Sequence, residues 1–298
     1  MGDVLSQVSE AMAQAVKTAG ESVVRVEGRR RLPASGILWS DDGLVLTAHH
    51  VLHHDDEIGI GLPDGETAPG KLVGRDPSTD LAVVRVEARA GKPARWMELD
   101  QLQVGHLVLA LGRPGKTVQA TLGVISALGE SWRTPGGGSV ERYLQTDVVM
   151  YPGFSGGPLV GMGGEVIGLN TSALVRGVSL TIPVPTLRKV VETLLTHGRV
   201  RRGFLGVGAQ PVRLPGALAE RLGQETGLLL LSVEADGPAE KGGLMLGDTL
   251  LALDGAPVRH LDELLGMLSG ERVGTSAKVR LLRGGETKEL KVTIGERP

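Results

Sequence analysis

The stretch GFSGGPL, Gly153–Leu159, decides the interpretation of this chain because it surrounds one serine with glycines and closes with a proline. Gly153 lacks a Cβ, so its backbone can adopt conformations closed to other residues and turn its N–H toward a reacting oxygen. With the N–H of Ser155 it would form an oxyanion hole for the negative charge that develops during acyl transfer. Plain glycine-rich turns also contain serine, so the motif needs support from the rest of the chain.

Composition excludes several classes of protein. The 298 residues include 32 Lys and Arg against 34 Asp and Glu, so no strongly basic face for nucleic acid or anionic lipid is expected. Aromatic residues make up 2%, too few for a base-stacking platform, and the absence of cysteine excludes disulfides and thiolate metal sites. The 45 glycines and 16 prolines favour short strands joined by tight turns.

The sequence also bears on the cellular compartment. No apolar run is long enough to span a bilayer. The N-terminus lacks the charged start, apolar run and small-residue cleavage site of a signal peptide. We therefore expect a cytoplasmic protein with no membrane span, or a periplasmic or other extracytoplasmic one if the chain is a truncated mature form.

Hydrophobic periodicity predicts the first domain. Apolar residues at helical spacing predict an N-terminal amphipathic helix over residues 1–20. A second helix is predicted over residues 185–196, with Gly198 as its stop. Between them, short β-rich runs alternate with turn residues, a pattern typical of an antiparallel barrel or sandwich. The clearest runs are 22–26, 37–39, 44–47, 81–86, 107–111, 124–128, 165–169 and 178–182.

A change of composition follows the second helix and predicts a domain boundary near residue 199. Beyond it, strand-like runs enclose two helical patterns, at 216–222 and 261–268. The strand-like runs are 204–209, 227–233, 248–253, 277–282 and 289–294. We therefore predict a first domain over residues 1–198 and a second over 199–298.

Two residues upstream of the serine have the types that a catalytic triad needs. His50 follows a strand-like run in LTAHHVL. Asp80 directly precedes an apolar run in RDPSTDLAVVRV, so its carboxylate can be half buried and directed at a neighbouring imidazole. The order His50, Asp80, Ser155 is that of chymotrypsin-like proteases.

Two other kinds of site have to be weighed. An α/β-hydrolase is excluded by residue order, because its acid and histidine follow the serine and only His197 and His260 do so here. A metal-binding β protein is the second alternative, because histidines crowd the segment after residue 48. No separate carboxylate–histidine cluster supports this metal site. Its ligands would be His49, His50, His53 and His54.

Three segments in this order, TAHHV, DPSTDLAVV and GFSGGPL, resemble the HtrA/Deg family of trypsin-like serine proteases. The second domain strengthens the resemblance, because RGFLGV at 202–207 and GPAEKGGLMLGDTLLALDG at 237–255 look like the PDZ domain of that family. The resemblance covers nearly everything after residue 20. It implies a mainly β fold, with a chymotrypsin-like double β-barrel protease domain of two six-stranded-type barrels and then a small α+β PDZ domain.

The resemblance implies an ATP-independent serine endopeptidase of protein quality control and the stress response, acting on unfolded or damaged proteins without a cofactor. His50 would be the general base and then the general acid, Asp80 would orient the imidazole, and Ser155 would attack. The oxyanion would be held by the N–H groups of Gly153 and Ser155. A homotrimer or larger homo-oligomer is also implied, although the N-terminal aromatic residues that lock the family's trimers are absent here.

The chain departs from the family pattern beside the nucleophile. Phe154 stands where the family usually has asparagine, next to the loop whose peptide flip switches activity in the family. The loop from Thr171 to Thr181 is short, and Ser179 stands where the family usually has glycine. The alternative function is therefore a catalytically restrained, PDZ-bearing chaperone or adaptor.

Substrate preference is predicted from Val149, which stands six residues before the nucleophile. In trypsin-like chains the residue at that position lies at the floor of the side-chain pocket. Met150 is next to it, and Ser179 is the third candidate for this pocket. None of the three is a carboxylate that would bind Lys or Arg, so we expect cleavage after small or medium aliphatic residues. Each methylene contributes only about 1 kcal/mol, so discrimination is expected to be loose.

The PDZ-like segment predicts a second binding site. Backbone N–H groups of one loop would bind the C-terminal carboxylate of a peptide, and the next strand offers an open edge for β-augmentation. That loop consists of Phe204, Leu205, Gly206 and Val207. Helix 261–268 would form the other wall of the groove, with Leu265 and Leu268 either facing the last side chain of the peptide or belonging to the core.

Overall fold

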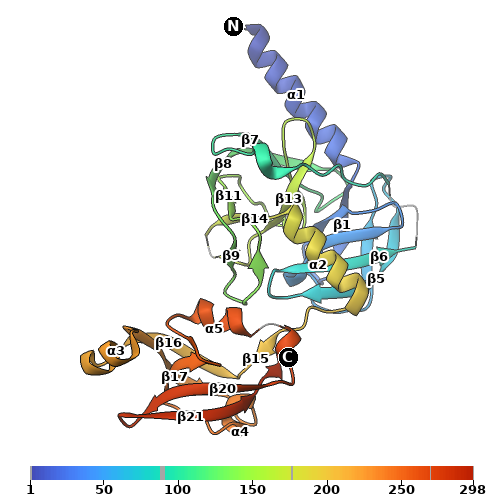
Figure 1. The fold of residues 1–298 in the computed structure, drawn as a ribbon. Helices are drawn as coiled ribbons and strands as arrows, with labels where there is room; N and C mark the ends of the chain where they lie inside the picture. The colour runs from blue at the N-terminus through green and yellow to red at the C-terminus, as the bar shows by residue number, and fades with distance from the viewer. Residues whose placement is uncertain (1, 88–90, 176, 269, 298) are drawn as a thin grey trace. The chain divides into compact units, whose positions relative to one another are not determined.

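A computed structural model of the protein describes residues 2–87, 91–175, 177–268 and 270–297. The chain forms two compact units, Met1–Val200 and Arg201–Pro298 (Figure 1). The division between the two units falls after Val200, whereas the boundary predicted from the sequence lies after residue 198.

Six antiparallel strands of the first unit close into a barrel in the order β1-β2-β3-β6-β5-β4. β2 and β3 are buried along their whole length, and their apolar side chains belong to a core that also includes residues of the second barrel. The strands are β1 (Val23–Glu27), β2 (Ala34–Leu38), β3 (Leu44–Ala48), β4 (Ile58–Gly61), β5 (Thr67–Asp76) and β6 (Leu81–Val86).

Six further strands of the same unit close into a second barrel in the order β11-β14-β13-β12-β7-β8. They are β7 (Leu107–Gly112), β8 (Gln119–Leu128), β11 (Leu144–Thr146), β12 (Pro158–Val160), β13 (Val166–Thr171) and β14 (Ser179–Pro183). A separate hairpin is formed by β9 (Trp132–Arg133) and β10 (Ser139–Val140). Two closed six-stranded barrels confirm the predicted double-barrel fold.

The connection between β13 and β14 differs from the expected loop. Thr171 is the last residue of β13 and Ser179 is the first residue of β14, so the connection runs over residues 172–178. Thr171 and Leu180 are paired across the two strands. The expectation of a loop from Thr171 to Thr181 is therefore wrong at both ends, because β13 extends beyond the predicted run 165–169 and β14 begins at Ser179, inside the predicted run 178–182.

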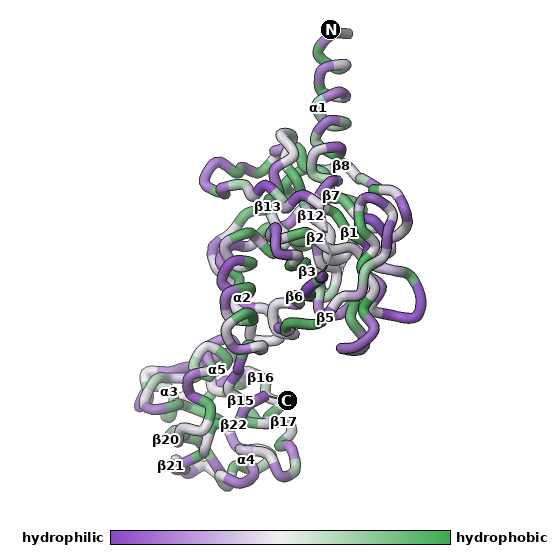
Figure 2. The backbone as a smooth tube through the Cα atoms, turned by 90° about the vertical axis from the view of Figure 1, so that its right-hand side faces the viewer, coloured by the Kyte–Doolittle hydropathy of each residue, from purple (hydrophilic) through white to green (hydrophobic). Residues whose placement is uncertain are grey.

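Two long helices complete the first unit, α1 (Gly2–Gly20) and α2 (Val184–His197). α2 begins at a proline pair and ends at Gly198, whose φ of 70° gives a left-handed C-cap. α1 packs only through its C-terminal half, where Ala15 and Ala19 are buried, whereas Val4 and Leu5 are exposed. Figure 2 shows apolar and polar residues alternating along the part of α1 that projects from the barrels.

The second unit is a small α+β fold. Its main sheet has the order β16-β17-β18-β20-β21, with β16 at one edge and β19 paired to β18. The strands are β15 (Gly203–Phe204), β16 (Val207–Arg213), β17 (Thr226–Val233), β18 (Thr249–Leu253), β19 (Ala256–Pro257), β20 (Ser276–Arg283), β21 (Glu286–Thr293) and β22 (Gly295–Glu296). The helices are α3 (Gly216–Leu222), α4 (Pro238–Lys241) and α5 (Leu261–Met267).

Candidate active site

His50 lies in a short 3-10 turn, η1 (His49–Val51), which directly follows β3. Ala48 is the last residue of β3 and pairs with the first residue of β6. The N–H of His49 then donates to the carbonyl of Asp80 at 3.0 Å. The turn therefore begins at a point fixed by the first barrel, which places the imidazole at the barrel edge.

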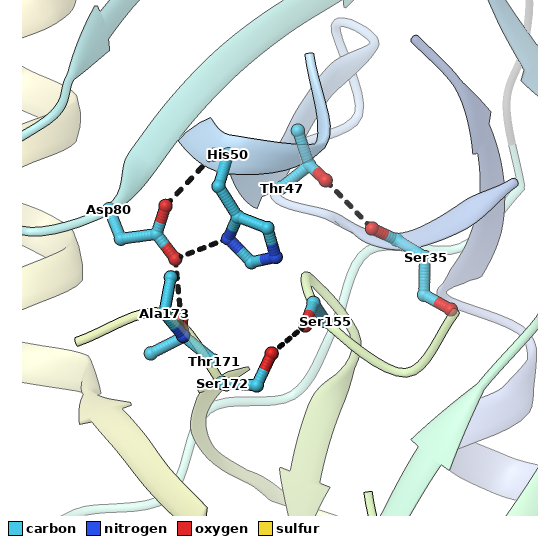
Figure 3. Close-up of polar contacts among 8 residues, drawn as sticks. All are labelled: Ser35, Thr47, His50, Asp80, Ser155, Thr171, Ser172 and Ala173. Atoms are coloured by element: carbon cyan, nitrogen blue, oxygen red, sulfur yellow. Dashed lines mark hydrogen bonds and ion pairs between the residues drawn. The ribbon is translucent and has the colours of Figure 1, made fainter. Parts of the chain in front are cut away.

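Asp80 immediately precedes β6, with a φ of 58° in the left-handed region that aspartate tolerates better than most residues. Its buried carboxylate receives three hydrogen bonds, one of them from Thr171 Oγ1. The backbone N–H of His50 donates to Oδ1 at 2.9 Å, and the ring Nδ1 lies 2.8 Å from Oδ2 (Figure 3). Because a carboxylate only accepts, Nδ1 carries the ring proton, which leaves Nε2 free to accept one.

Ser155 lies on the side of the imidazole away from Asp80 (Figure 3). Its Oγ is 3.2 Å from Ser172 Oγ, and among the described residues no hydrogen bond joins it to His50. In unliganded enzymes catalytic hydrogen bonds are often long and shorten when substrate is bound. The first barrel thus supplies His50 and Asp80, the second supplies Ser155, and the structure brings the three residues together.

The backbone before Ser155 forms a tight turn. The N–H of Phe154 donates to the carbonyl of Tyr151 at 3.0 Å, and Gly153 has a φ of 94°. A proline at the second position and a positive φ at the third are typical of a type II turn. A Cβ at residue 153 would also lie 2.6 Å from Pro114 Cβ, so both the dihedral angle and the space require glycine here.

Two N–H groups next to the serine are left available. No atom of the residues that the structure describes accepts a hydrogen bond from the N–H of Gly153 or of Ser155. The carbonyl of Phe154 accepts from Gly157 at 2.9 Å, so the Ser155 N–H on the same trans peptide points the opposite way. Two free N–H donors beside a serine hydroxyl are the groups that an oxyanion hole requires.

Phe154 anchors this turn in the second barrel. Its side chain is fully buried in the barrel's core cluster. The ring lies against Gly112 on β7, where a Cβ would be only 2.7 Å from Cδ1 of the phenylalanine. Tyr151 meets the ring edge-on, with ring centroids 5.8 Å apart. The aromatic side chain therefore fills the barrel core beneath the turn.

The residues predicted for the specificity pocket lie in one region of the second barrel. Val149 is exposed, and its carbonyl accepts from Thr121 Oγ1 at 2.9 Å. Ser179 Oγ donates to the carbonyl of Val148 at 3.1 Å, and Met150 packs partly against the barrel core. Thr121 is marked by no sequence motif. The segment before the nucleophile is therefore tied to β8 and β14 through hydroxyl–carbonyl hydrogen bonds.

The histidines that follow β3 do not converge on one point. His49 is half-buried, and that burial lowers the pKa of its imidazole. The N–H of His53 donates to a backbone carbonyl at 2.8 Å, and His54 Nδ1 is bonded to the carbonyl of Asp56. Across the described part of the chain, no group of three or more His, Cys, Asp or Glu side chains is placed to hold a metal ion.

The loop predicted to bind a peptide carboxylate lies between β15 and β16, with Phe204 ending one strand and Val207 beginning the next. Gly206 has a φ of 76°, which glycine adopts readily. The N–H groups of Leu205 and Gly206 have no acceptor among the described residues. Of the strands described in this unit, β16 pairs only with β17, so one edge is free to accept a peptide strand.

The two predicted groove residues near α5 differ in their surroundings. Leu265 lies on α5 and is half-buried. Leu268 follows the end of α5 and is buried in the core cluster of the second unit. Its carbonyl accepts from the N–H of Gly203 at 3.0 Å. The sequence left open whether Leu268 contacts the peptide or belongs to the core, and the structure places it in the core.

Three polar residues at the site were not selected from the sequence. Thr171 donates to Asp80, Ser172 contacts the nucleophile, and Ser35 Oγ donates to the carbonyl of Gly153 at 2.6 Å. None belongs to a catalytic motif. The sequence signal for the first two is their position at the end of β13, which pairs with the strand that follows the nucleophile.

Comparison with protein families matches residues 34–169 to the trypsin-like peptidase domain and residues 203–294 to the PDZ domain. The chain is 40% identical over 270 residues to a probable periplasmic serine endoprotease DegP-like of Ectopseudomonas mendocina (strain ymp). It is 36% identical over 280 residues to a protein of the same name from Chlamydia trachomatis serovar D. These matches cover 89% and 92% of this chain but 56% of each relative, so the chain spans about half the length of the curated relatives it matches.

Solved structures match nearly the whole chain. The HtrA-type protease AlgW with a decapeptide has a TM-score of 0.74 and 30% identity, covering 96% of this chain and 99% of that one. The serine endoprotease from Yersinia pestis has a TM-score of 0.75 and 32% identity, with coverage of 96% and 98%.

The described residues contain no helix that is long and apolar enough to cross a membrane. The curated relatives are named periplasmic, so the expectation of a cytoplasmic protein finds no support among them. The first unit matches the trypsin-like peptidase domain, the second matches the PDZ domain, and solved HtrA-type structures match nearly the whole chain. The chain belongs to the HtrA family of trypsin-like serine proteases, in which a PDZ domain follows the peptidase domain.

Proposed function

We propose that the protein is a serine endopeptidase of protein quality control that cleaves unfolded or damaged proteins through an acyl-enzyme. The observation that carries the proposal is the distance of 2.8 Å between His50 Nδ1 and Asp80 Oδ2, with Ser155 on the other side of the imidazole. A histidine held in this tautomer can accept the serine proton. The names of the relatives, serine endoproteases, support the same reaction.

The reaction begins when His50 Nε2 removes the proton from Ser155 Oγ, which attacks the carbonyl carbon of the scissile peptide. The hydroxyl must first turn away from Ser172, a rotation about one side-chain bond. The negative oxygen of the tetrahedral intermediate accepts from the N–H groups of Gly153 and Ser155, while Asp80 stabilises the imidazolium. The imidazolium then protonates the leaving amine. A water molecule, deprotonated by His50 in the same way, attacks the acyl-enzyme and releases the carboxylic acid product.

The proposal includes cleavage after small or medium aliphatic residues. Val149 and Met150 supply apolar surface, and Ser179 directs its hydroxyl to a backbone carbonyl. Each buried methylene contributes about 1 kcal/mol, so preferences of less than about tenfold among aliphatic residues are expected. Sequencing the products of denatured casein tests this preference, and cuts that follow Lys or Arg would contradict it.

The PDZ domain is proposed to bind exposed C-termini of polypeptides. The free N–H groups of Leu205 and Gly206 would bind the carboxylate, and the edge of β16 would pair with the peptide backbone. Structures of AlgW with a decapeptide and with a tripeptide support a peptide ligand for this family. Calorimetry with one peptide in free-acid and amidated forms tests the proposal, because amidation should lower the affinity at least about tenfold.

The chaperone or adaptor alternative requires Phe154 to restrain the site. Burial of this ring in the barrel core, together with a positive φ at Gly153, favours an enzyme, because both oxyanion donors remain without a protein acceptor. The periplasmic names of the relatives support an extracytoplasmic compartment. Assembly as a homotrimer or larger oligomer is carried over from the family, and light scattering from the purified chain tests it.

Digestion of casein tests the proposed activity. The wild-type chain should degrade casein without ATP, and Ser155→Ala or His50→Ala should lower kcat by on the order of 10⁶. Both variants should still bind casein, because the substitutions remove only the reacting groups. Binding without cleavage by the wild-type chain would contradict the peptidase and favour the chaperone.

A further inference from the structure

An oxyanion hole needs its neighbouring peptide planes held in place, and hydrogen bonds accepted by the carbonyl groups of those planes can hold them. We propose that Ser35, on β2 of the first barrel, is a positioning residue that fixes the loop carrying Ser155. This inference rests on the proposed peptidase function. It assigns a role to a residue that lies 120 positions before the nucleophile in the sequence.

Ser35 contacts both residues that supply the proposed oxyanion donors. Its side chain is 0% exposed. Its Oγ donates to the carbonyl of Gly153 at 2.6 Å, and its backbone N–H donates to the carbonyl of Ser155 at 3.2 Å. Figure 3 shows Ser35 on the side of Ser155 away from His50. One serine of the first barrel therefore holds the turn by two separate groups.

The first of these bonds fixes the peptide plane between Gly153 and Phe154. At one end of this plane the Phe154 N–H donates to the carbonyl of Tyr151 at 3.0 Å. At the other end the Gly153 carbonyl accepts from Ser35. A plane bonded at both ends cannot rotate without losing a buried hydrogen bond, so the backbone is fixed on the C-terminal side of Gly153, the residue that supplies the first proposed donor.

The second bond fixes the peptide plane that follows Ser155. Its carbonyl accepts from the N–H of Ser35, and its other end, the Gly156 N–H, donates to the carbonyl of Asn170 at 2.9 Å. Gly156 has a φ of 86°, and a Cβ there would lie 2.1 Å from the Ser35 carbonyl. The glycine after the nucleophile therefore allows the two barrels to approach closely enough for Ser35 to make these bonds.

Ser35 is itself held in place. The backbone N–H of Arg113 donates to Ser35 Oγ at 2.8 Å, so the hydroxyl proton is directed to the remaining partner, the Gly153 carbonyl. Thr47 Oγ1 donates to the Ser35 carbonyl at 2.8 Å. The Arg113 guanidinium also donates to the carbonyl of Gly20, the last residue of α1, at 3.1 Å. The hydrogen bonds from Ser35 to the loop that carries Ser155 are therefore part of a buried network within the peptidase unit.

Kinetics of the full chain carrying Ser35→Ala test the inference. With a fluorogenic peptide we expect kcat to fall about 10- to 100-fold and KM to change less than about threefold, because the lost bond positions the transition-state donors. Affinity for a peptide boronic acid, whose oxygen occupies the oxyanion hole, should fall in parallel. The matched control is Ser22→Ala, which removes another buried serine whose Oγ donates to the Ala19 carbonyl at 2.7 Å. It should keep kcat within about twofold of the wild type.

An unchanged kcat and boronate affinity in folded Ser35→Ala would overturn the inference while leaving the peptidase intact. If Ser35→Ala does not fold, Ser35→Cys decides, because the thiol has similar size but is a weak donor. A reduced kcat with unchanged KM in Ser35→Cys supports the inference, and wild-type kcat overturns it. Absence of hydrolysis by the wild-type chain overturns the proposed function, and the inference with it.

Discussion

Ser155 Oγ lies 3.2 Å from Ser172 Oγ, so the hydroxyl proposed as nucleophile is paired with a second serine; among the described residues it makes no hydrogen bond to His50. Ser172 directly follows Thr171, whose hydroxyl donates to Asp80. The end of β13 therefore contacts both the acid and the nucleophile. Before Ser155 can attack, its hydroxyl has to leave Ser172 and form a hydrogen bond with His50.

Replacing Ser172 by alanine should free this hydroxyl for His50. A hydrogen bond between neutral groups contributes about 0.5–1.5 kcal/mol, so the rate of reaction with a fluorophosphonate should rise about two- to tenfold. The control is Thr196→Ala on α2, which removes a hydroxyl that donates to the carbonyl of Glu192 at 2.8 Å. It should react at the wild-type rate. A slower reaction in the Ser172 variant would mean that this serine assists the nucleophile.

Thr171→Val should weaken the catalytic contribution of Asp80. The substitution keeps the shape of the side chain and removes one of three hydrogen bonds to the Asp80 carboxylate. Hydrogen bonds to charged groups contribute about 1.5–3 kcal/mol, so kcat for peptide hydrolysis should fall about 10- to 100-fold. Thr181→Val is the control, because its hydroxyl donates instead to Asn170 Oδ1 at 2.9 Å. Equal activities of the two variants would contradict the role of Thr171.

The contact between Gly112 and Phe154 predicts a coupled effect on stability. Gly112→Ala would place a methyl group 2.7 Å from the ring, which should cost about 1–3 kcal/mol in the free energy of unfolding. The smaller side chain of Phe154→Leu should recover part of that loss in the double variant. Urea unfolding followed by tryptophan fluorescence measures the three values. Strict additivity of the single effects would contradict direct packing of residue 112 against the ring.

Stability of the PDZ domain should depend on acid pH through Asp248. Burial of this carboxyl by itself raises its pKa, but the Arg283 guanidinium, with two N···O distances of 2.7 Å, and the Met245 N–H outweigh burial and hold the pKa below its usual value. A carboxyl with a lowered pKa in the folded state stabilises the domain above the unfolded-state pKa of about 3.9. This contribution is lost as the pH falls through the folded-state pKa.

Asp248→Asn should therefore flatten the decline of stability below about pH 4. Urea unfolding followed by methyl NMR signals of Leu230 and Leu253, both buried in this domain, measures the effect. Asp262→Asn on the exposed side of α5 is the control and should keep the wild-type pH dependence. Identical pH dependence in Asp248→Asn and the wild type would show that the ion pair does not control acid stability.

The sequence predicted the fold where its signals are local. Strands such as β6 have continuous apolar runs, and α2 has both helical spacing and a glycine stop, so both could be placed. β4 and β5 could not, because glycine and proline interrupt the alternation. The reason for two of these glycines is tertiary: a Cβ at Gly59 would lie 2.7 Å from a Glu27 side-chain atom, and one at Gly61 would lie 2.9 Å from Arg25.

The candidate site divides in the same way. His50, Asp80 and Ser155 were selected because each stands in a motif of recognisable order. Ser35 and Thr171 were not, because a lone hydroxyl residue in a strand becomes informative only when another barrel strand brings its partner within hydrogen-bond distance. The sequence marks which residues react, and the packing of the two barrels decides which residues hold them.

Covalent labelling of the full chain by a fluorophosphonate, with the modified residue located by mass spectrometry, tests the assembled site most directly. The probe reacts with a serine only when a base activates it and an oxyanion hole receives the developing charge. We predict labelling at Ser155 alone in the wild-type chain and none in His50→Ala. A folded wild-type chain that stays unlabelled, or that is labelled at another serine, would contradict the proposed active site.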